Sequence, residues 1–276
     1  MRVFLHIYVF VLGAVVGSFL NVCIARLPEN RSLVRPGSRC PKCENPIRWY
    51  DNLPILSFLV LRGKCRNCGT PISLQYPAVE LLTAVLFILL MHRFTNITAL
   101  TIYMIFTSSL VVVTFIDLKH YIIPDEISIP GAVVGLLLSI LPAHLTDGQL
   151  LSHSFVDSLI GCVLGGGLLY LTALFSLVVF KKEGMGGGDV KLLAMVGAFL
   201  GWKPVLITIV LGSVLGALVG VTLIALRLRG RKDYIPFGPY LALAALLSLV
   251  WGDRLLEFYL LFGQRLNDLI LLIPGV

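Results

Sequence analysis

Long apolar stretches separated by short polar segments run along most of the chain. The first stretch, VFLHIYVFVLGAVVGSFL, covers residues 3–20, and a later one, VLITIVLGSVLGALVGVTLIAL, covers residues 205–226. A helix of about 20 apolar residues crosses the hydrocarbon core of a bilayer. The stretches lack the alternation of apolar and polar positions that transmembrane strands show. The pattern therefore predicts an all-α polytopic membrane protein with about eight transmembrane helices.

The composition agrees with this prediction. Hydrophobic residues make up 57% of the 276 residues and charged residues only 13%, whereas soluble domains are about 25% charged. The first stretch is preceded by a single basic residue, Arg2, and no A-x-A-like cleavage site follows it. We therefore expect it to be a retained helix within residues 1–23 rather than a cleaved signal peptide.

One long polar segment, residues 24–76, separates the first apolar stretch from the second. Its residues 24–75 carry nine of the basic side chains and three of the acidic ones, which accounts for six of the chain's seven net positive charges. Beside membrane helices, such an excess marks the cytoplasmic side. We therefore expect a cytoplasmic loop domain at 24–76, no nucleic-acid partner, and a membrane-embedded domain at 77–276.

Counting crossings from this loop gives the remaining topology. The segment at 142–154, PAHLTDGQLLSHS, contains no Lys or Arg and is expected to be an external loop, whereas Lys181 and Lys182 are expected on the cytoplasmic side. The tail is interrupted by WGDR, so one or two crossings fit it. The predicted crossings are residues 77–92, 97–116, 127–142, 157–180, 190–202, 204–226 and the tail 240–276.

The polar loop contains two C-x2-C pairs. Cys40 and Cys43 form the first pair, Cys65 and Cys68 the second, and 21 residues lie between the pairs. Two such pairs are typical of a structural zinc site with four thiolate ligands. A pair of disulfides and a redox-active C-x-x-C are the alternatives. A cytoplasmic location argues against disulfides, and a redox pair normally occurs singly.

Two carboxylates lie at the predicted cytoplasmic ends of apolar helices. Asp117 ends the stretch VVVTFID, and Asp189 follows the glycine-rich segment GMGGG at 184–188. Acids in membrane helices are candidates for function because a buried charge is costly there. Two adjacent carboxyl groups that share one proton can hydrolyse a peptide bond. An ion or proton pathway and a structural role use the same acids and remain open, whereas a phosphate loop lacks its G-K-[ST] sequence.

Five segments together carry a resemblance to a known family. They are GSFLNVCIARLP, the cysteine-containing segment from SRCPKC to YPAVEL, FIDLKHYIIPD, EGMGGGDVKLLAMVGAFLGW and IPFGPYLA. In order and spacing, the chain resembles the bacterial type IV prepilin peptidases, also called leader peptidase/N-methyltransferases. The GGGD sequence at 186–189 also resembles the wider group of G-x-G-D membrane aspartic proteases.

The resemblance implies a specific activity. Such an enzyme cleaves the short basic leader of prepilins and pseudopilins at the cytoplasmic face of the inner membrane, then methylates the new amino terminus with S-adenosylmethionine. The catalytic pair carries over to Asp117 and Asp189, with Asp125 of the D-x6-P-D sequence as the rival of Asp117. The cysteine loop favours the bifunctional type. The alternatives are a G-x-G-D protease that acts on other signal-like peptides without methylation, and a non-enzymatic membrane scaffold or transporter.

Overall fold

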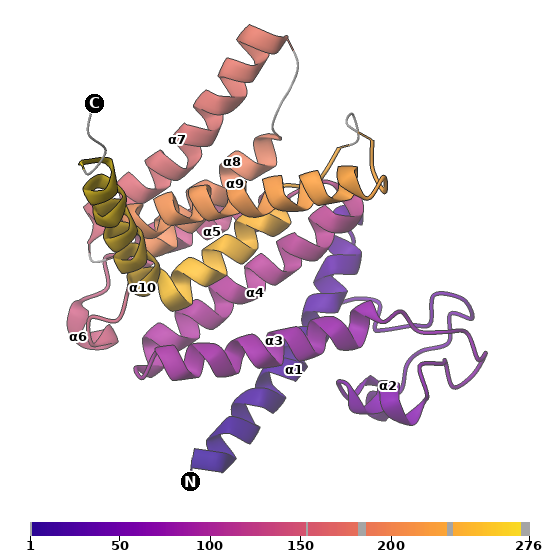
Figure 1. The fold of residues 1–276 in the computed structure, drawn as a ribbon. Helices are drawn as coiled ribbons and strands as arrows, with labels where there is room; N and C mark the ends of the chain where they lie inside the picture. Colours follow the sequence, from indigo (N-terminus) through magenta and orange to yellow (C-terminus); the bar gives the residue numbers. More distant parts are fainter. Residues whose placement is uncertain (1, 153, 182–185, 231–233, 272–276) are drawn as a thin grey trace. The chain divides into compact units, whose positions relative to one another are not determined.

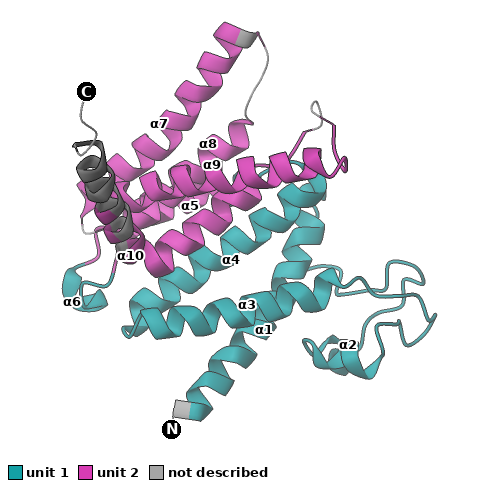
Figure 2. Cartoon of the chain, in the orientation of Figure 1, with its two compact units in different colours: residues 1–127, 142–149 teal, residues 128–141, 150–276 magenta. Residues whose placement is uncertain are grey.

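The computed structural model describes residues 2–152, 154–181, 186–230 and 234–271 (Figure 1). Within these ranges the chain folds into helices and loops, and its only β-pairing consists of two isolated bridges in the polar loop. This confirms the predicted all-α class. The chain divides into two compact units, residues 1–127 with 142–149, and residues 128–141 with 150–276 (Figure 2).

Three long helices build the first unit: α1 (Arg2–Arg26), α3 (Gln75–Arg93) and α4 (Ile97–His120). All three pack against one another, and each contributes side chains to one buried apolar cluster. Because α1 continues to Arg26, the first helix is longer than the predicted 1–23.

Glycines allow α1 and α3 to approach each other closely. A Cβ atom placed on Gly13 would lie 2.6 Å from the Cα of Ala84, and one on Gly17 would lie 2.7 Å from the Cα of Glu80. Real Cβ atoms do not approach backbone atoms so closely, so these positions require glycine. Small residues at helix contacts are the usual basis of close packing within membranes.

The polar loop between α1 and α3 contains only short helices: η1 (Leu27–Glu29), η2 (Trp49–Asn52) and α2 (Leu56–Val60). The segment predicted as an external loop at 142–154 also contains one, α6 (Ala143–Thr146). The side chain of Gln149 ties this segment to the α3–α4 turn. Its Oε1 accepts hydrogen bonds from the N–H groups of Thr95 and Asn96.

The second unit contains α5 (Asp125–Leu138, shared at its start with the first unit), α7 (Phe155–Phe180), α8 (Gly187–Leu200), α9 (Trp202–Ala225) and α10 (Gly238–Leu271). In this unit α7, α8 and α9 pack together, and α10 packs on α8 and α9.

Two glycines set the geometry of α8. A Cβ on Gly197 would lie 2.0 Å from the carbonyl oxygen of Gly161 on α7, so the two backbones are in direct contact. Gly201 joins α8 to α9 with φ of +83°, in the left-handed region that favours glycine. This glycine produces the hairpin predicted for residues 190–226.

Five helices of the described residues are long and apolar enough to cross a membrane, namely α1, α3, α4, α7 and α9. At 14 residues each, α5 and α8 are about 21 Å long, less than a typical hydrocarbon core. Helix α10 is kinked at Trp251. The membrane class is confirmed, but the prediction of eight transmembrane helices is not.

Candidate functional site

The cysteine loop is built as two copies of one small turn. In the first copy the N–H of Cys40 donates to the carbonyl of Asn45 and the N–H of Glu44 donates to Cys40. In the second copy, 25 positions later, Cys65 donates to Thr70 and Gly69 donates to Cys65. An antiparallel bridge closes each copy, Arg39 with Pro46 and Lys64 with Pro71. The matching sequences CPKCENPI and CRNCGTPI therefore fold alike.

The two turns bring the four thiols together. The sulfur atoms of Cys40, Cys43, Cys65 and Cys68 all lie within 4.8 Å of one another, and Cys40 Sγ is 3.8 Å from Cys68 Sγ. Four thiolates at the Zn–S distance of about 2.3 Å in a tetrahedron are about 3.8 Å apart. The arrangement thus fits one metal ion such as zinc, and all six cysteines are free of disulfides.

Local hydrogen bonds act on the thiols directly. Backbone N–H groups of Cys43 and Lys42 lower the pKa of Cys40, and the hydroxyl and N–H of Thr70 lower the pKa of Cys68 to about 6. Although the N–H of Asn45 opposes it, burial together with the neighbouring thiols raises the pKa of Cys43 to about 11. A divalent cation bound by the four sulfur atoms would displace the protons that the thiols hold.

Metal binding would also explain how the loop is ordered. Of residues 25–78, all of which the structure describes, Cys40 alone is buried. A segment with so little apolar burial does not fold on its own core. Ligation energy becomes folding energy in such domains.

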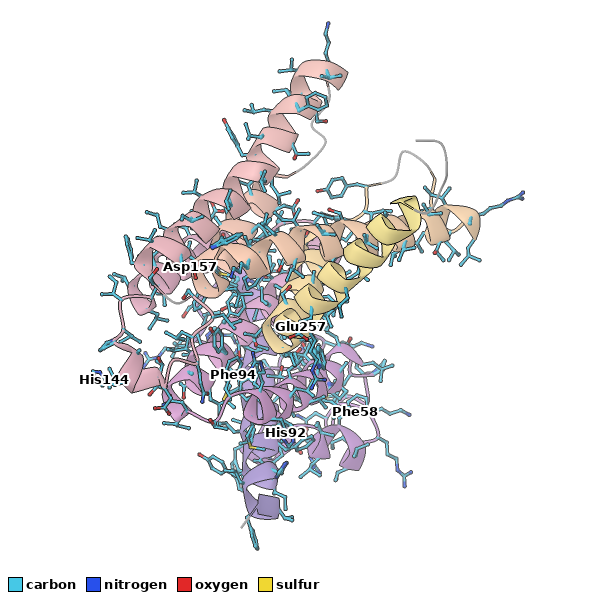
Figure 3. The ribbon with its side chains drawn as sticks, turned by 60° about the vertical axis from the view of Figure 1, so that its left-hand side comes forward. Phe58, His92, Phe94, His144, Asp157 and Glu257 are labelled. Carbon is cyan, nitrogen blue, oxygen red and sulfur yellow. The ribbon has the colours of Figure 1, made fainter. Side chains whose placement is uncertain are left out.

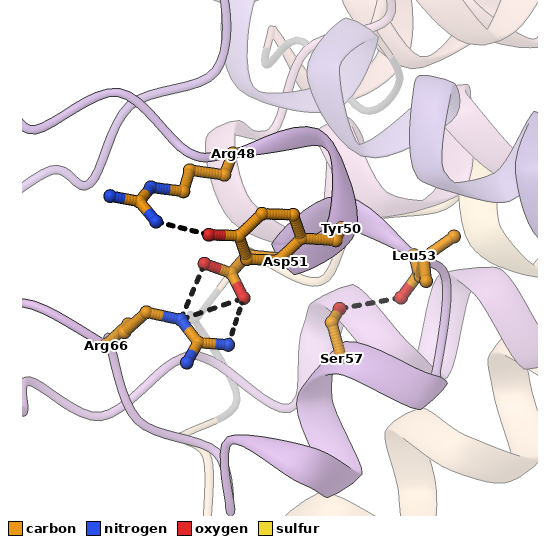
Figure 4. A network of polar contacts seen from close by, with 6 residues as sticks. All are labelled: Arg48, Tyr50, Asp51, Leu53, Ser57 and Arg66. Atoms are coloured by element: carbon orange, nitrogen blue, oxygen red, sulfur yellow. Dashed lines mark hydrogen bonds and ion pairs between the residues drawn. The ribbon is translucent and has the colours of Figure 1, made fainter.

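A polar network links the second turn to η2 (Figure 4). The guanidinium of Arg66 donates three hydrogen bonds to the carboxylate of Asp51, at 2.6 to 3.1 Å. These bonds hold the pKa of Asp51 below its usual value. Beside it, Arg48 donates to the hydroxyl of Tyr50. The ring of Phe58, which is labelled in Figure 3, would lie 3.1 Å from a Cβ atom placed on Gly63.

One buried carboxyl group joins the loop to the helix pair α1–α3. Glu80, on the second turn of α3, is 7% exposed. Its Oε2 accepts a hydrogen bond of 2.7 Å from the N–H of Ile55, the residue before α2. Ile55 has φ of 61° and ψ of −49°, and the N–H of Leu56 donates to the carbonyl of Pro54. This is a γ-turn with a β-branched residue at its centre, a strained conformation.

The two candidate catalytic aspartates are both buried, each 4% exposed. Asp117 lies in the last turn of α4, and its backbone carbonyl accepts the N–H of Tyr121, which ends the helix in a left-handed conformation. Asp189 lies in the first turn of α8, and its N–H donates to the carbonyl of Gly186. Asp125, by contrast, is exposed at the start of α5.

Two glycines precede Asp189 at the start of α8 without being crowded by the described residues. A Cβ placed on Gly186 would lie 3.5 Å from Asp189 Oδ2 and 3.7 Å from the hydroxyl of Tyr234, which are ordinary contact distances. One placed on Gly187 would meet nothing within 4 Å. Among the residues that the structure describes, nothing crowds either position so as to require glycine. The preceding glycine, Gly184, lies outside the described residues.

Comparison with known proteins places these features in a family. Residues 11–94 match the profile of the bacterial peptidase A24 N-terminal domain, and residues 104–221 match that of the type IV leader peptidase family. A prepilin leader peptidase/N-methyltransferase of Aeromonas salmonicida is 38% identical over 277 residues, covering 91% of this chain and 92% of that protein. The chain belongs to the type IV leader peptidase family.

Other members of the leader peptidase family show comparable similarity. The prepilin leader peptidase/N-methyltransferase of Pseudomonas aeruginosa is 37% identical over 275 residues, covering 91% of this chain and 92% of that one. The protein of the same name from Myxococcus xanthus is 42% identical over 218 residues, which are 79% of this chain but 63% of that protein. No solved structure matches the chain.

Of the two predicted sites, the cysteine cluster and the aspartate pair, the structure brings together the residues of the first. The four cysteines meet as expected. Asp117 belongs to the first compact unit and Asp189 to the second, so their pairing stays a prediction. Sequence reasoning missed Glu80, which lies within the apolar run AVELLTAVLF and has its partner 25 residues earlier. The signal that could have identified Glu80 was the presence of an acidic residue within an apolar helix, because such acids are candidates for function.

Proposed function

We propose that the chain removes the leader peptide of type IV prepilins or pseudopilins and methylates the amino terminus that cleavage creates. The relatives named prepilin leader peptidase/N-methyltransferase support this activity. The observation that carries the proposal is the burial of two aspartates, Asp117 and Asp189, at the ends of two helices. We assign them as the catalytic pair.

The chemistry needs one ionised and one protonated carboxyl group. Two carboxyl groups in close contact cannot both ionise, so the pair holds a single proton. The ionised member takes a proton from water while the protonated member donates a hydrogen bond to the scissile carbonyl. The water oxygen then attacks the carbonyl carbon, and the amine leaves after receiving a proton from the pair.

The positions of the two aspartates in their helices support a proposal for which residue takes which role. Asp189 lies in the first turn of α8, where the positive end of the helix dipole favours a carboxylate. Asp117 lies in the last turn of α4, where the negative end favours the protonated form. Asp189 is therefore the base that activates water, and Asp117 is the acid that polarises the carbonyl.

The glycines before Asp189 support a role in binding an extended peptide. Gly186 and Gly187 are required neither by crowding nor by a positive φ. A side chain at position 186 would lie against the carboxylate of Asp189. Glycine keeps that space free, so the backbone of a leader peptide can approach closely.

The remaining parts of the proposal concern the loop and the membrane. We propose zinc as the metal held by Cys40, Cys43, Cys65 and Cys68, where it orders the loop. S-adenosylmethionine would supply a methyl group bound to a positively charged sulfur, and we assign no residues to it. The cysteine loop and both aspartates face the cytoplasm in this proposal, because the loop carries most of the chain's positive charge.

A cleavage assay with purified protein tests the assignment. The purified protein, in detergent or nanodiscs, is incubated with a prepilin and S-adenosylmethionine. Mass spectrometry then measures leader removal and the addition of one methyl group separately. Asp117→Asn and Asp189→Asn should abolish leader removal, whereas Asp125→Asn should retain it. Leader removal by both Asp117→Asn and Asp189→Asn would refute the aspartic mechanism.

A further inference from the structure

Helix α2 presents its apolar side chains outward. Leu56, Leu59 and Val60 are 62%, 65% and 76% exposed, and their spacing of three and four residues places them on one face of the helix. Just before them, Trp49 is 80% exposed and Leu53 43%. We call these five residues the α2 patch. Proteins surrounded by water rarely expose so many large apolar side chains together, and such patches mark sites of interaction.

Basic side chains flank the patch. Arg48, Arg62 and Lys64 are all exposed. Arg48 directly precedes the patch, and the other two follow it within four residues. The whole loop has nine basic and three acidic residues in positions 24–75. An apolar stripe bordered by Lys and Arg is the pattern of helices that lie in the interface of an anionic membrane. Exposed tryptophan is likewise enriched at that depth.

The attachment of α2 places the patch near a membrane helix. The γ-turn at Ile55 immediately precedes α2, and its N–H is held by the carboxyl group of Glu80. Glu80 is the sixth residue of α3, one of the helices long enough to span the bilayer. The bond therefore fixes the start of α2 beside the first two turns of α3, at one end of a helix long enough to span the bilayer.

We propose that α2 docks on the anionic phospholipid leaflet next to α1 and α3, with Leu56, Leu59 and Val60 inserted among the lipids and the basic residues on phosphate groups. The loop then has two fixed points, the Glu80 bond and the lipid surface. This docking concerns the position of the loop and holds whether or not the two aspartates form a catalytic pair.

Fluorescence quenching in the full-length chain tests the docking. Trp49, Trp202 and Trp251 are replaced by Phe, and a single tryptophan is introduced by Leu59→Trp. The matched control is Lys42→Trp, an exposed position within the first cysteine turn. Both variants are placed in nanodiscs of anionic lipid with brominated acyl chains, and zinc content is measured to show that the loop is folded.

The proposal expects the two tryptophans to behave in opposite ways. The tryptophan at position 59 should lose most of its emission to brominated lipid and resist iodide, whereas the one at position 42 should be quenched by iodide. Replacing the anionic lipid by a neutral one should weaken lipid quenching at position 59. Iodide quenching at position 59 equal to that at position 42 would overturn the proposal.

If the patch binds something other than lipid, the fluorescence results differ, and either of the two outcomes below would also overturn the proposal. If the patch binds the apolar part of a prepilin, position 59 is untouched by brominated lipid and its emission shifts to shorter wavelength only when prepilin is added. If it binds a second copy of the chain, the shift appears when two copies are placed in one nanodisc and is absent with one.

Discussion

The bond between Glu80 and Ile55 makes a quantitative prediction about the cysteine loop. In Glu80→Ala the N–H of Ile55 loses its acceptor, which is 2.7 Å away. A hydrogen bond to a carboxyl group is worth about 1–3 kcal/mol. The bond offsets a strained centre at Ile55, with φ of 61°, and such strain costs about 1–3 kcal/mol. Without the bond, the γ-turn should relax and release the start of α2.

Hydrogen exchange of the full-length protein measures this release. Helix α2 depends on Ile55 because the N–H of Leu59 donates to the carbonyl of Ile55. A loss of about 1.4–2.8 kcal/mol corresponds to a 10-fold to 100-fold change in the opening equilibrium. Amides of Leu56–Val60 should therefore exchange about 10 to 100 times faster in Glu80→Ala. Glu80→Gln retains an acceptor oxygen and should show a smaller increase.

Thr83→Ala is the matched control for this experiment. Thr83 is also buried on α3, but its hydroxyl donates to the carbonyl of Val79 within the same helix. Exchange in α2 should not change in this variant. Equal exchange of α2 in the wild type and in Glu80→Ala, with zinc content preserved, would refute the role assigned to the bond.

Two further predictions concern packing and the metal. Gly197→Ala should lower the midpoint of thermal unfolding, because its Cβ would lie 2.0 Å from the carbonyl oxygen of Gly161; overpacking of this kind costs about 1–3 kcal/mol or more. Gly167→Ala, where a Cβ meets nothing within 4 Å, should be neutral or stabilising by up to about 1 kcal/mol. Cys65→Ser should reduce bound zinc, measured by elemental analysis, from about one ion per chain to well below one. Trypsin should then cleave the loop faster, and unchanged zinc content would contradict the four-thiolate site.

The helices were largely predictable because apolar runs in membranes form helices. The predicted helix at 97–116 is the core of α4, and the glycine-rich segment before Asp189 correctly marked the start of α8. Helix ends within apolar sequence were not predictable: α5 stops at Leu138 although the apolar run continues to Leu141. Hydrophobicity alone does not distinguish a helical residue from an apolar residue in the turn that follows.

The candidate sites also differ in how far the sequence predicts them. The cysteine cluster was predictable because two C-x2-C pairs fold locally into similar turns. The Glu80–Ile55 contact was not, because turn rules assign a positive φ to glycine or asparagine and give no signal at isoleucine. The pairing of Asp117 with Asp189 stays a prediction from chemistry and family membership, because the two residues lie in separate compact units.

Cross-linking tests directly whether the two aspartates are in contact. In a chain that carries Asp117→Cys and Asp189→Cys, with Cys23 and Cys162 replaced by Ala, a short bifunctional thiol reagent is added in the membrane and linked peptides are identified by mass spectrometry. Shared-proton chemistry requires contact between the carboxyl groups, so positions 117 and 189 should link in high yield. The control pair, Asp125→Cys with Asp189→Cys, should link poorly. A strong link between 125 and 189, with none between 117 and 189, would contradict the assigned catalytic pair.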